Sequence, residues 1–594
     1  MCGIAGLQKS IITESEISSV DQMCKRMQHR GPDHQGIWHD EHVCFGHRRL
    51  SIIDLSVAAN QPMLSHDKRF VITFNGEIYN FLELKSELEK NGVTFRTKSD
   101  TELIIEAYRF WGKNCLHKFN GMFAFAIWDT VEKKMFVARD RFGKKPFFYT
   151  QIDNGFCFAS EIHALLQYSE VKRKISLAAF NCFLSIGYIL NPQTIFEDIY
   201  QLQPAHYMVI DVSGKIIENQ QYWNYADTFR NKTNDSNSTI KDNLVQLLKQ
   251  SVQRRMISDV PVGAFLSGGV DSSTIVALMK AFHKGDLHTF SVGFNQKSYN
   301  ELPDAERVAA FAKTIHHSHY CAPENPLTAL EGYVDVFDQP FADNSLIPMI
   351  EVSHLARKFV TVVLSGDGAD ELFAGYITYK ADKYYQFAKY IPMFLKKYLG
   401  KEKKINSSQK IGFQYKIQQF FNGCKHDYKK AHYLWRSYFG VENRIQILGN
   451  EHKEMVYDTD PFKQFDKYYG EVKDLSHFDQ HFFVDGMTWL PDDILTKVDR
   501  TTMYASIEAR APFLDIDFVN YANSIPHTLK LKHLKTKYIL KEAIRGIVPD
   551  YVLEKKKSGF NAPVNSWIKG EYANEFQNFN KFVYDRFNNQ YESR

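Results

Sequence analysis

The sequence has almost no net charge, no long apolar run and no cysteine motif, and each absence narrows its function. Its 594 residues carry 73 basic and 69 acidic side chains, a net charge of only +4. This gives no electrostatic reason to expect nucleic acid as a partner. No apolar stretch approaches a membrane span, and no basic segment followed by an apolar one opens the chain, so we expect no membrane partner and no signal peptide. The eight cysteines are scattered without a C-x-x-C pair, which favours free thiols in a cytoplasmic protein.

Length and hydrophobic content predict more than one domain. A chain of 594 residues that is 44% hydrophobic exceeds one ordinary core. Residues 1–223 hold short runs rich in Phe, Val and Ile, among them FVITFNGEIYN, GMFAFAIWD and HYMVI, which are typical of strands. The best helical pattern in this half is 99–112, where Ser99 and Glu102 have the spacing of a capping box. We therefore expect layered sheets with some helix here.

The composition changes after residue 223. Residues 224–241 are poor in apolar side chains and rich in Asn, Ser and Thr, so we interpret them as a linker. Residues 242–594 alternate strand-like and helical patterns, which predicts an α/β, doubly wound parallel sheet. About 377–480 is rich in Tyr, Phe, Lys and Gln without β signals, and we expect a helical insertion rather than a nucleic-acid surface.

A glycine turn at 265–273, FLSGGVDSS, joins an apolar strand to a helix. Such a junction presents main-chain N–H groups and a positive helix end, which suit a phosphate. The turn lacks the spacing and the lysine of a Walker A loop. Asp271 places a carboxylate where a Mg²⁺ ion beside the phosphates would need an oxygen ligand. A plain glycine turn capped by Ser and Asp is the alternative.

A second strand–turn–helix element supports the phosphate site. VTVVLSGDGADELFAGY, residues 360–376, brings Asp367, Asp370 and Glu371 to the carboxyl end of another strand. Ligands of doubly wound sheets lie at that edge. Two acidic turns there would hold the Mg²⁺ of a nucleotide triphosphate between them. GDGADE lacks the last glycine of G-x-G-x-x-G, so it is weak evidence for NAD.

The histidine cluster HHSHY, at 316–320, is a weak candidate for a metal site. No carboxylate or cysteine completes a ligand spacing around it. We expect these residues to form a loop after a helix.

The chain start, MCGIAG, raises the question of why Cys2 directly follows the initiator methionine. If Met1 is removed, Cys2 gains a free α-amine with a reference pKa of about 7.7–8.0, which can take the thiol proton. The Asn75 amide and the Gly76 main-chain N–H can donate to an oxyanion. Arg49 suits a carboxylate through its fork.

Glu77 and Asp100 can meet the ammonium group of a ligand. Each of these residues also has a structural alternative. Asn75 and Gly76 can be a hairpin turn, Asp100 can start a helix, Arg48 competes with Arg49, and Cys2 can be a small buried hydrophobe.

Together these motifs resemble the glutamine-hydrolysing asparagine synthetase family and its class II glutamine amidotransferase half. The resemblance spans essentially the whole chain and includes HRGPDHQG, RDRFGKKPFF, LPDDILTKVDR, SIEARAPFLD and KKKSGFNAP. It implies an α+β N-terminal-nucleophile domain, an αββα sandwich, followed by an ATP-pyrophosphatase-type synthetase domain at 242–594. It implies catalytic roles for Cys2, Asn75, Gly76, Asp367 and Lys537, and glutamine binding by Arg49, Asn75, Glu77 and Asp100. It implies ATP binding by Leu266, Ser267, Gly268, Gly269, Asp271, Ser272, Ser273, Val292, Ser365 and Gly366, with Asp271 and Asp370 as Mg²⁺ ligands.

The activity implied is glutamine-dependent asparagine synthesis, with ATP as co-substrate and Mg²⁺ as cofactor. Ammonia released at Cys2 would travel through an internal tunnel to an aspartyl-adenylate. Some relatives carry Glu where this chain has Asp367, which is one methylene shorter and so reaches less far toward the intermediate. Alternatives are the same chemistry on another carboxylate, such as a sugar uronic acid of a surface polysaccharide, and a non-catalytic or glutaminase-only protein. A homodimer is implied only by analogy.

Overall fold

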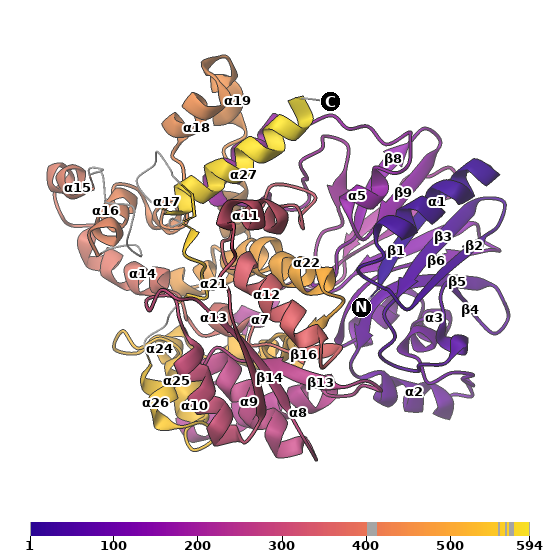
Figure 1. Cartoon of the computed structure of the whole chain (residues 1–594), viewed down its shortest axis with the longest axis horizontal. Coiled ribbons are helices and arrows are strands. Elements are labelled where there is room, and N and C mark those ends of the chain that lie inside the picture. Colours follow the sequence, from indigo (N-terminus) through magenta and orange to yellow (C-terminus); the bar gives the residue numbers. More distant parts are fainter. Residues whose placement is uncertain (1, 401–412, 556–558, 565–566, 569–574, 593–594) are drawn as a thin grey trace.

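The computed structural model describes residues 2–400, 413–555, 559–564, 567–568 and 575–592. Part of the predicted helical insertion and part of KKKSGFNAP lie outside these residues. Figure 1 shows an N-terminal half built on two sheets beside a C-terminal half built on a third sheet, with further helices beyond it.

The N-terminal half holds two six-stranded sheets. The first has the order β10-β8-β9-β1-β3-β2, formed by Tyr200–Gln201, Phe148–Ile152, Gly155–Ala159, Gly3–Lys9, Val43–Arg49 and His34–His39. The second has the order β12-β11-β7-β6-β5-β4, formed by Ile216–Gln221, His206–Asp211, Lys134–Arg139, Gly121–Asp129, Phe70–Ile78 and Met63–Leu64.

Alternation along the strands makes this half a four-layer sandwich. In β1, Ile4 faces the second sheet in a shared core, whereas Ala5 and Leu7 face the core under α1, because successive strand side chains point to opposite faces. Helices α1 (Glu14–Arg26) and α5 (Ile162–Leu165) cover the first sheet, and α2 (Phe81–Lys90) and α3 (Asp100–Trp111) cover the second. The αββα order confirms the predicted fold class of this half.

The third sheet is parallel throughout. Its order is β15-β14-β13-β16-β17, formed by Ile315–Tyr320, His288–Gly293, Val262–Phe265, Val362–Leu364 and Glu508–Arg510. Helices α9 (Val270–Phe282) and α10 (Leu302–Ala312) pack together on one face, and α12 (Leu346–Arg357) and α22 (Thr496–Tyr504) on the other (Figure 1). This is the predicted doubly wound arrangement.

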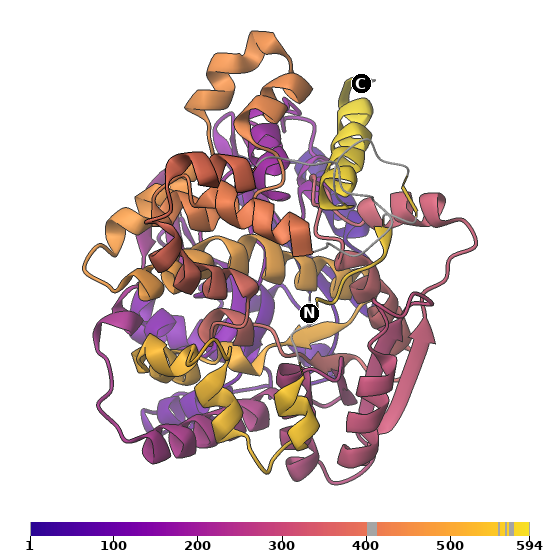
Figure 2. The ribbon, with the colours of Figure 1, turned by 90° about the vertical axis from the view of Figure 1, so that its left-hand side faces the viewer.

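Helices supply most of the remaining chain. They are α4 (Cys115–Lys118), α6 (Leu177–Ile186), α7 (Asp227–Arg230), α8 (Asn237–Arg255), α11 (Pro326–Val334), α13 (Ala369–Leu372), α14 (Ile377–Ala388), α15 (Met393–Leu399), α16 (Phe413–Gly423), α17 (Tyr428–Leu434), α18 (Val441–Leu448), α19 (Lys453–Asp458), α20 (Phe462–Glu471), α21 (His477–Met487), α23 (Ile516–Ser524), α24 (His527–Lys530), α25 (Tyr538–Ala543), α26 (Asp550–Glu554) and α27 (Glu575–Glu592). Figure 2, turned by 90°, brings the helices of 377–480 toward the viewer.

Three local expectations differ from the structure. HHSHY is not a loop but edge strand β15, which pairs with β14 from Ile315 to Tyr320. Ser99 caps α3 through the Thr101 N–H, but Glu102 does not close a capping box, because its carboxylate accepts the main-chain N–H groups of Arg96 and Thr97.

The segment predicted as a linker is largely folded. Residues 224–241 contain α7 and the first turn of α8, and Tyr225, Phe229 and Ile240 are buried. Three well-spaced apolar side chains are enough to anchor the segment, although its average composition is polar.

Candidate functional site

Cys2 lies at the start of β1 in a small cavity of about 30 Å³. The cavity brings together five predicted residues, namely Cys2, Arg49, Gly76, Glu77 and Asp100. Burial raises the pKa of the Cys2 thiol, and the nearby Leu50 N–H and Arg49 lower it only in part. The thiol therefore needs a base to react near neutral pH. A volume of this size holds little more than a water molecule, so a glutamine molecule could enter only if the lining moved.

Asn75 is held by one end of its amide only. Its Oδ1 accepts the main-chain N–H of Cys2 at 3.0 Å. Its Nδ2 is buried and makes no hydrogen bond to the described part of the chain. A buried amide donor without a partner is costly, and next to a nucleophile it suits an oxyanion. Asn75 lies within β5, opposite Ala124 of β6, which rules out the hairpin-turn alternative.

Gly76 is required by the close approach of β6. A Cβ at this position would lie 2.1 Å from the Met122 carbonyl oxygen and 2.7 Å from the Phe123 Cα. Because both atoms belong to the main chain, no side-chain adjustment would relieve the clash.

Arg49, and not Arg48, lines the cavity. Arg48 donates to the Gly31 carbonyl and to Gln35. The terminal nitrogens of Arg49 donate to Ser56 O and Asn60 Oδ1, and also to Asp54 O. Oxygen atoms of segment 53–60 thus already accept hydrogen bonds from the Arg49 guanidinium. A substrate carboxylate would have to replace some of these acceptors.

Acidic side chains from both halves of the chain meet beside Cys2. Asp100, the first residue of α3, accepts the Ile78 N–H at 3.0 Å, and burial together with Glu508 raises its pKa to about 7. Burial and Asp100 also raise the pKa of Glu77 well above its usual range. Arg510 of β17 pairs with Glu77 at 3.2 Å and with Glu508 at 2.6 Å.

Glu508 and Arg510 received no role from the sequence. Glu508 lines the Cys2 cavity although it comes from the third sheet. Burial opposes ionisation of Glu508, but the pair with Arg510 lowers its pKa. Both residues stand in the SIEARAPFLD motif, and that match was the only available signal.

The 265–273 turn forms the predicted strand–turn–helix junction. Gly269 precedes α9 directly, and no side chain caps the first turn of this helix. Gly268 has a φ of +67°, and a Cβ there would meet the main chain of Asp304 and Ala305 at 2.6–2.7 Å. The Ser267 and Ser272 hydroxyl groups lie 3.1 Å apart. The turn therefore leaves the N–H groups at the start of α9 for a ligand.

The acidic side chains of both turns converge on one lysine. Lys537 Nζ lies 2.5 Å from Asp271 Oδ2 and 2.5 Å from Asp370 Oδ1. Asp271 Oδ1 is buried and makes no hydrogen bond within the described residues. Asp367 accepts the Ser365 hydroxyl at 2.6 Å, and burial raises its pKa.

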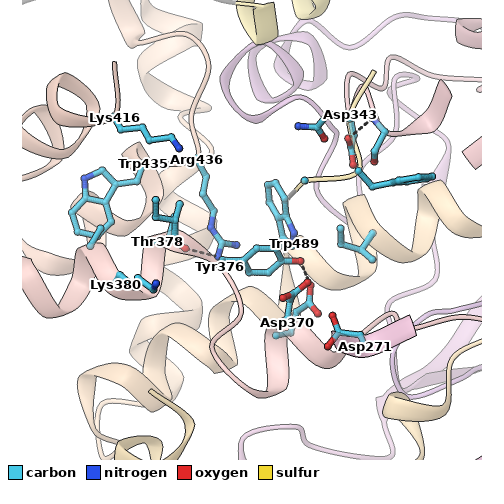
Figure 3. A pocket seen from close by; sticks show the side chains of 18 of the residues that line it. Asp271, Asp343, Asp370, Tyr376, Thr378, Lys380, Lys416, Trp435, Arg436 and Trp489 are labelled. Atoms are coloured by element: carbon cyan, nitrogen blue, oxygen red, sulfur yellow. Dashed lines mark hydrogen bonds between the residues drawn. The ribbon is translucent and has the colours of Figure 1, made fainter. Parts of the chain in front are cut away.

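A large cavity of about 1320 Å³ adjoins this cluster (Figure 3). Of the predicted nucleotide-site residues, the cavity lining contains Leu266, Ser267, Asp271, Ser272, Ser365, Gly366, Asp367 and Asp370. The lining does not contain Gly268, Gly269, Ser273, Val292 or Lys537. Val292 is buried in β14, whose neighbouring residues Phe290 and Ser291 line the cavity instead.

Lys497 and Asp343 also line this cavity, and neither was singled out as a functional residue. They form an ion pair at 2.6 Å, and although burial disfavours the ammonium, Asp343 raises the pKa of Lys497. Lys497 lies on α22, which follows a π-helical turn, Leu490–Leu495. Such turns occur often at functional sites.

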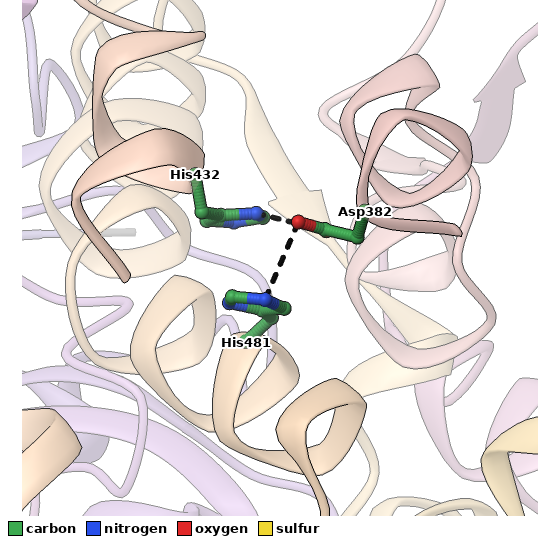
Figure 4. Close-up of side chains that lie close together, drawn as sticks. All are labelled: Asp382, His432 and His481. Carbon is green, nitrogen blue, oxygen red and sulfur yellow. Dashed lines mark hydrogen bonds and ion pairs between the residues drawn. The ribbon is translucent and has the colours of Figure 1, made fainter. Parts of the chain in front are cut away.

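Asp382, His432 and His481 form the one group in the described residues whose geometry could hold a metal ion (Figure 4). His432 lies 3.0 Å from Asp382 and 3.1 Å from Asp485, one contact through each ring nitrogen. Burial disfavours its charged form, but the two carboxylates raise its pKa to about 9. With Arg436 paired to Asp485 at 2.7 Å, the charges balance without an ion. We interpret the cluster as a link between α14, α17 and α21.

Comparison with known proteins assigns a family to both halves of the chain. Residues 1–223 match the glutamine amidotransferase domain model, and residues 243–579 match the asparagine synthase model. The chain is 37% identical over 575 residues to asparagine synthetase 1, glutamine-hydrolysing, of Bacillus subtilis, across 96% of this chain and 88% of that protein. The chain belongs to the asparagine synthetase family.

Two further curated proteins and one solved structure are also similar to the chain. A putative glutamine-hydrolysing asparagine synthetase of Mycobacterium tuberculosis is 34% identical, across 93% of this chain and 85% of that protein. A protein of Gibberella zeae named amidase chry2 is 28% identical, across 95% of this chain and 87% of that protein. A solved allosteric regulatory enzyme of purine biosynthesis overlaps 55% of this chain and 81% of its own, at 17% identity and a TM-score of 0.30.

Membership of the asparagine synthetase family makes this chain an ATP-dependent amidotransferase ligase. Within the residues that the structure describes, no helix is long and apolar enough to cross a bilayer.

Proposed function

We propose that this chain hydrolyses glutamine at Cys2 and transfers the ammonia to a carboxylate that it has activated with ATP. Aspartate is the first acceptor to consider, and the products would then be asparagine, glutamate, AMP and pyrophosphate. The observation that carries the proposal is the position of Arg510. Its guanidinium pairs with Glu77 beside Cys2, while its carbonyl oxygen accepts the N–H of Ser365, which lines the nucleotide cavity.

The proposed glutaminase step begins with removal of Met1, which would make the Cys2 nitrogen a free amine. This amine takes the thiol proton, and the sulfur attacks the side-chain amide carbon of glutamine. The Asn75 Nδ2 donor and the Gly76 N–H would stabilise the oxyanion, and one such donor is worth about 2.7–4 kcal/mol. The α-ammonium gives its proton to the amide nitrogen as the C–N bond breaks, so ammonia departs and a thioester remains. Water then hydrolyses the thioester to glutamate and frees Cys2.

Substrate recognition is assigned by charge. Arg49 would bind the glutamine carboxylate, and ionised Asp100 and Glu77 would bind its ammonium group. These assignments are supported by the lining of the Cys2 cavity, which contains all three side chains.

The proposed synthetase step takes place in the large cavity. The 267–273 turn would hold the β- and γ-phosphates, with Leu266, Val292, Ser365 and Gly366 near the nucleoside. An acceptor carboxylate oxygen attacks the α-phosphorus, and the bond to pyrophosphate breaks. Ammonia then displaces AMP from the acyl-adenylate with loss of one proton. Asp367 and Lys537 would lie near this intermediate.

The carboxylates at the sheet edge fit a magnesium ion. Asp271 Oδ1 is buried and makes no hydrogen bond to the residues that the structure describes, and Asp370 lies beside the same lysine. Carboxylate oxygens are the ligands that Mg²⁺ prefers. Asp271 and Asp370 would hold the ion, and when bound it would neutralise charge on the leaving pyrophosphate.

The test is an assay of glutamine- and ATP-dependent AMP formation with a panel of carboxylates, aspartate first. Cys2→Ala should abolish AMP formation with glutamine but retain it with ammonium chloride. A folded Cys2→Ala protein that also lost the ammonia-dependent reaction would contradict the division into two sites.

A further inference from the structure

The cavity beside the nucleotide turn is much larger than its proposed small substrates require. Its volume of about 1320 Å³ exceeds the roughly 300–1,000 Å³ of pockets that bury a drug-sized ligand. One end lies at Asp271 and Asp370, and the lining extends to Lys380 of α14, Lys416 of α16 and Trp435 after α17 (Figure 3). ATP is itself of drug-like size and would take the end of the cavity at the nucleotide turn. Aspartate has a single short side chain and could fill only a small part of the space that remains.

The far wall of the cavity is aromatic. Phe420 and Trp435 stack with ring centroids 5.7 Å apart and planes 19° from parallel. Phe387 and Phe421 add two further rings to the lining. Such a wall favours an apolar body, because each buried methylene contributes about 0.8 kcal/mol.

Cationic side chains stand among these rings. Lys380, Lys416 and Arg436 belong to the lining (Figure 3). Lys380 and Lys416 lie on the side of the cavity away from Asp271, so they suit a second anionic group of the same ligand.

The apolar lining continues onto the surface of the protein. Ile377, Tyr384 and Phe387 of α14 all line the cavity, yet they are 60%, 51% and 79% exposed. Continuous exposed apolar surface that leads into a pocket marks a binding site. A ligand that covered these side chains would extend from the cavity to its mouth.

We propose that the acceptor is a carboxylate carried on a large amphipathic molecule rather than free aspartate. Its carboxylate lies beside the nucleotide turn, its apolar body lies along α14 and α16, and an anionic group reaches Lys380 and Lys416. This inference rests on the proposed function, because it names the acceptor of the same reaction. The bond changes stay the same: a P–O bond to pyrophosphate breaks as the adenylate forms, and a C–O bond to AMP breaks as the amide forms.

Two probes that share a head group test the apolar requirement. N-acetyl-L-aspartate and N-octanoyl-L-aspartate differ by six methylenes and are compared with L-aspartate in glutamine-dependent pyrophosphate release. Each buried methylene is worth about fourfold, so kcat/KM should be at least about tenfold higher for the octanoyl than for the acetyl compound. Equal values for the two, or L-aspartate as the best acceptor, would overturn the inference and leave the proposed function standing. No pyrophosphate with any carboxylate would overturn the proposed function itself.

Matched surface variants locate the apolar body. Phe387→Ser removes an aromatic ring that is 79% exposed and lines the cavity, and Tyr390→Ser removes one that is 79% exposed outside the lining. Phe387→Ser should lower kcat/KM for N-octanoyl-L-aspartate about tenfold, whereas Tyr390→Ser should leave it unchanged, and glutamine hydrolysis should persist in both. Ala381→Trp, which narrows the cavity from α14, should weaken the octanoyl compound more than the acetyl compound. Equal effects of Phe387→Ser and Tyr390→Ser would contradict the placement along α14.

Discussion

At the scale of single residues, Asn75 uses one half of its amide to hold Cys2 and leaves the other half without a partner. Its Oδ1 accepts the Cys2 N–H, while its Nδ2 is buried and makes no hydrogen bond to the described residues. Asn75→Ala should therefore lower kcat for glutamine hydrolysis about 10²- to 10³-fold, because an oxyanion donor acts mainly in the transition state. Glutamate release measures the loss. Ammonia-dependent AMP formation is the control, and an equal loss there would show that the variant had disturbed the fold.

Asp100 makes a second residue-scale prediction, for pH dependence. Its pKa of about 7 means that the carboxyl group is neutral below pH 7 and ionised above it. Ionised Asp100 attracts the glutamine ammonium, so kcat/KM for glutamine should rise between pH 6 and pH 8. Glu77, Glu508 and Arg510 face the same group and contribute to the observed midpoint.

The Asp100→Asn variant separates this titration from that of the Cys2 amine. The variant should have a lower kcat/KM and lose the step near pH 7, while the step of the amine, near a pKa of about 8, should remain. An unchanged profile would show that Asp100 does not bind the ammonium group.

At the scale of elements, β17 connects the two reaction sites. Its three residues pair with β16, which leads into the acidic turn. They place Glu508 in the lining of the Cys2 cavity and pair Arg510 with Glu77 of that lining. Arg510→Lys keeps the positive charge but loses the fork that reaches Glu77, Glu508 and the carbonyls of Arg255 and Ile257.

We expect Arg510→Lys to release more glutamate than AMP, because the link between the sites is weakened. The measurement is the ratio of glutamate to AMP with saturating substrates. Arg545→Lys, at an exposed arginine, is the matched control and should keep the ratio of the unchanged protein. A lower melting temperature without a change in the ratio would show that Arg510 has only a structural role.

The elements themselves were largely predictable from the sequence. The 265–273 and 360–376 turns each carry a short β-branched or apolar run, glycines and a helical pattern, and both form strand, turn and helix as predicted. The strand at HHSHY was not predictable. An edge strand forms by pairing with a neighbouring strand, and its neighbour β14 lies 22 or more residues earlier in the chain. The contact between Arg510 and Glu77 was also out of reach, because it joins residues 433 positions apart.

At the scale of the whole molecule, a substitution that removes the activity of one site should leave the activity of the other site in place, because the two sites lie in different halves. Asp271→Ala should stop pyrophosphate and AMP formation and spare glutamine hydrolysis, the reverse of Cys2→Ala. Pyrophosphate and glutamate, measured in the same reactions, give the two patterns. Pyrophosphate release by Asp271→Ala at the unchanged rate would remove Asp271 from the nucleotide site.

The interface between the two halves links the two reaction sites, so they are not completely independent of each other. Arg30, beside Cys2, donates to the Cys2 carbonyl and pairs with Asp499 of α22 at 2.9 Å. Lys497, two residues before Asp499 and so on the opposite face of α22, lines the nucleotide cavity. Removing one partner of such a buried ion pair strongly destabilises the folded protein, because it leaves the other charge buried without compensation. The LPDDILTKVDR motif marked this helix in the sequence. The motif gave no indication that one face of the helix contacts the Cys2 site and the opposite face lines the nucleotide cavity.

Lys537 has a further consequence for how the nucleotide-free protein meets its ligands. Its ammonium bridges Asp271 and Asp370, so a tethered counter-ion already stands where a divalent cation would have to bind. Free magnesium would have to displace that buried ammonium from both carboxylates, whereas a triphosphate brings oxygens that can receive it. Magnesium chloride alone should therefore leave the melting temperature unchanged, and magnesium with ATP should raise it. Changes in the free magnesium concentration would then not alter the nucleotide-free protein, and magnesium would bind only together with the triphosphate.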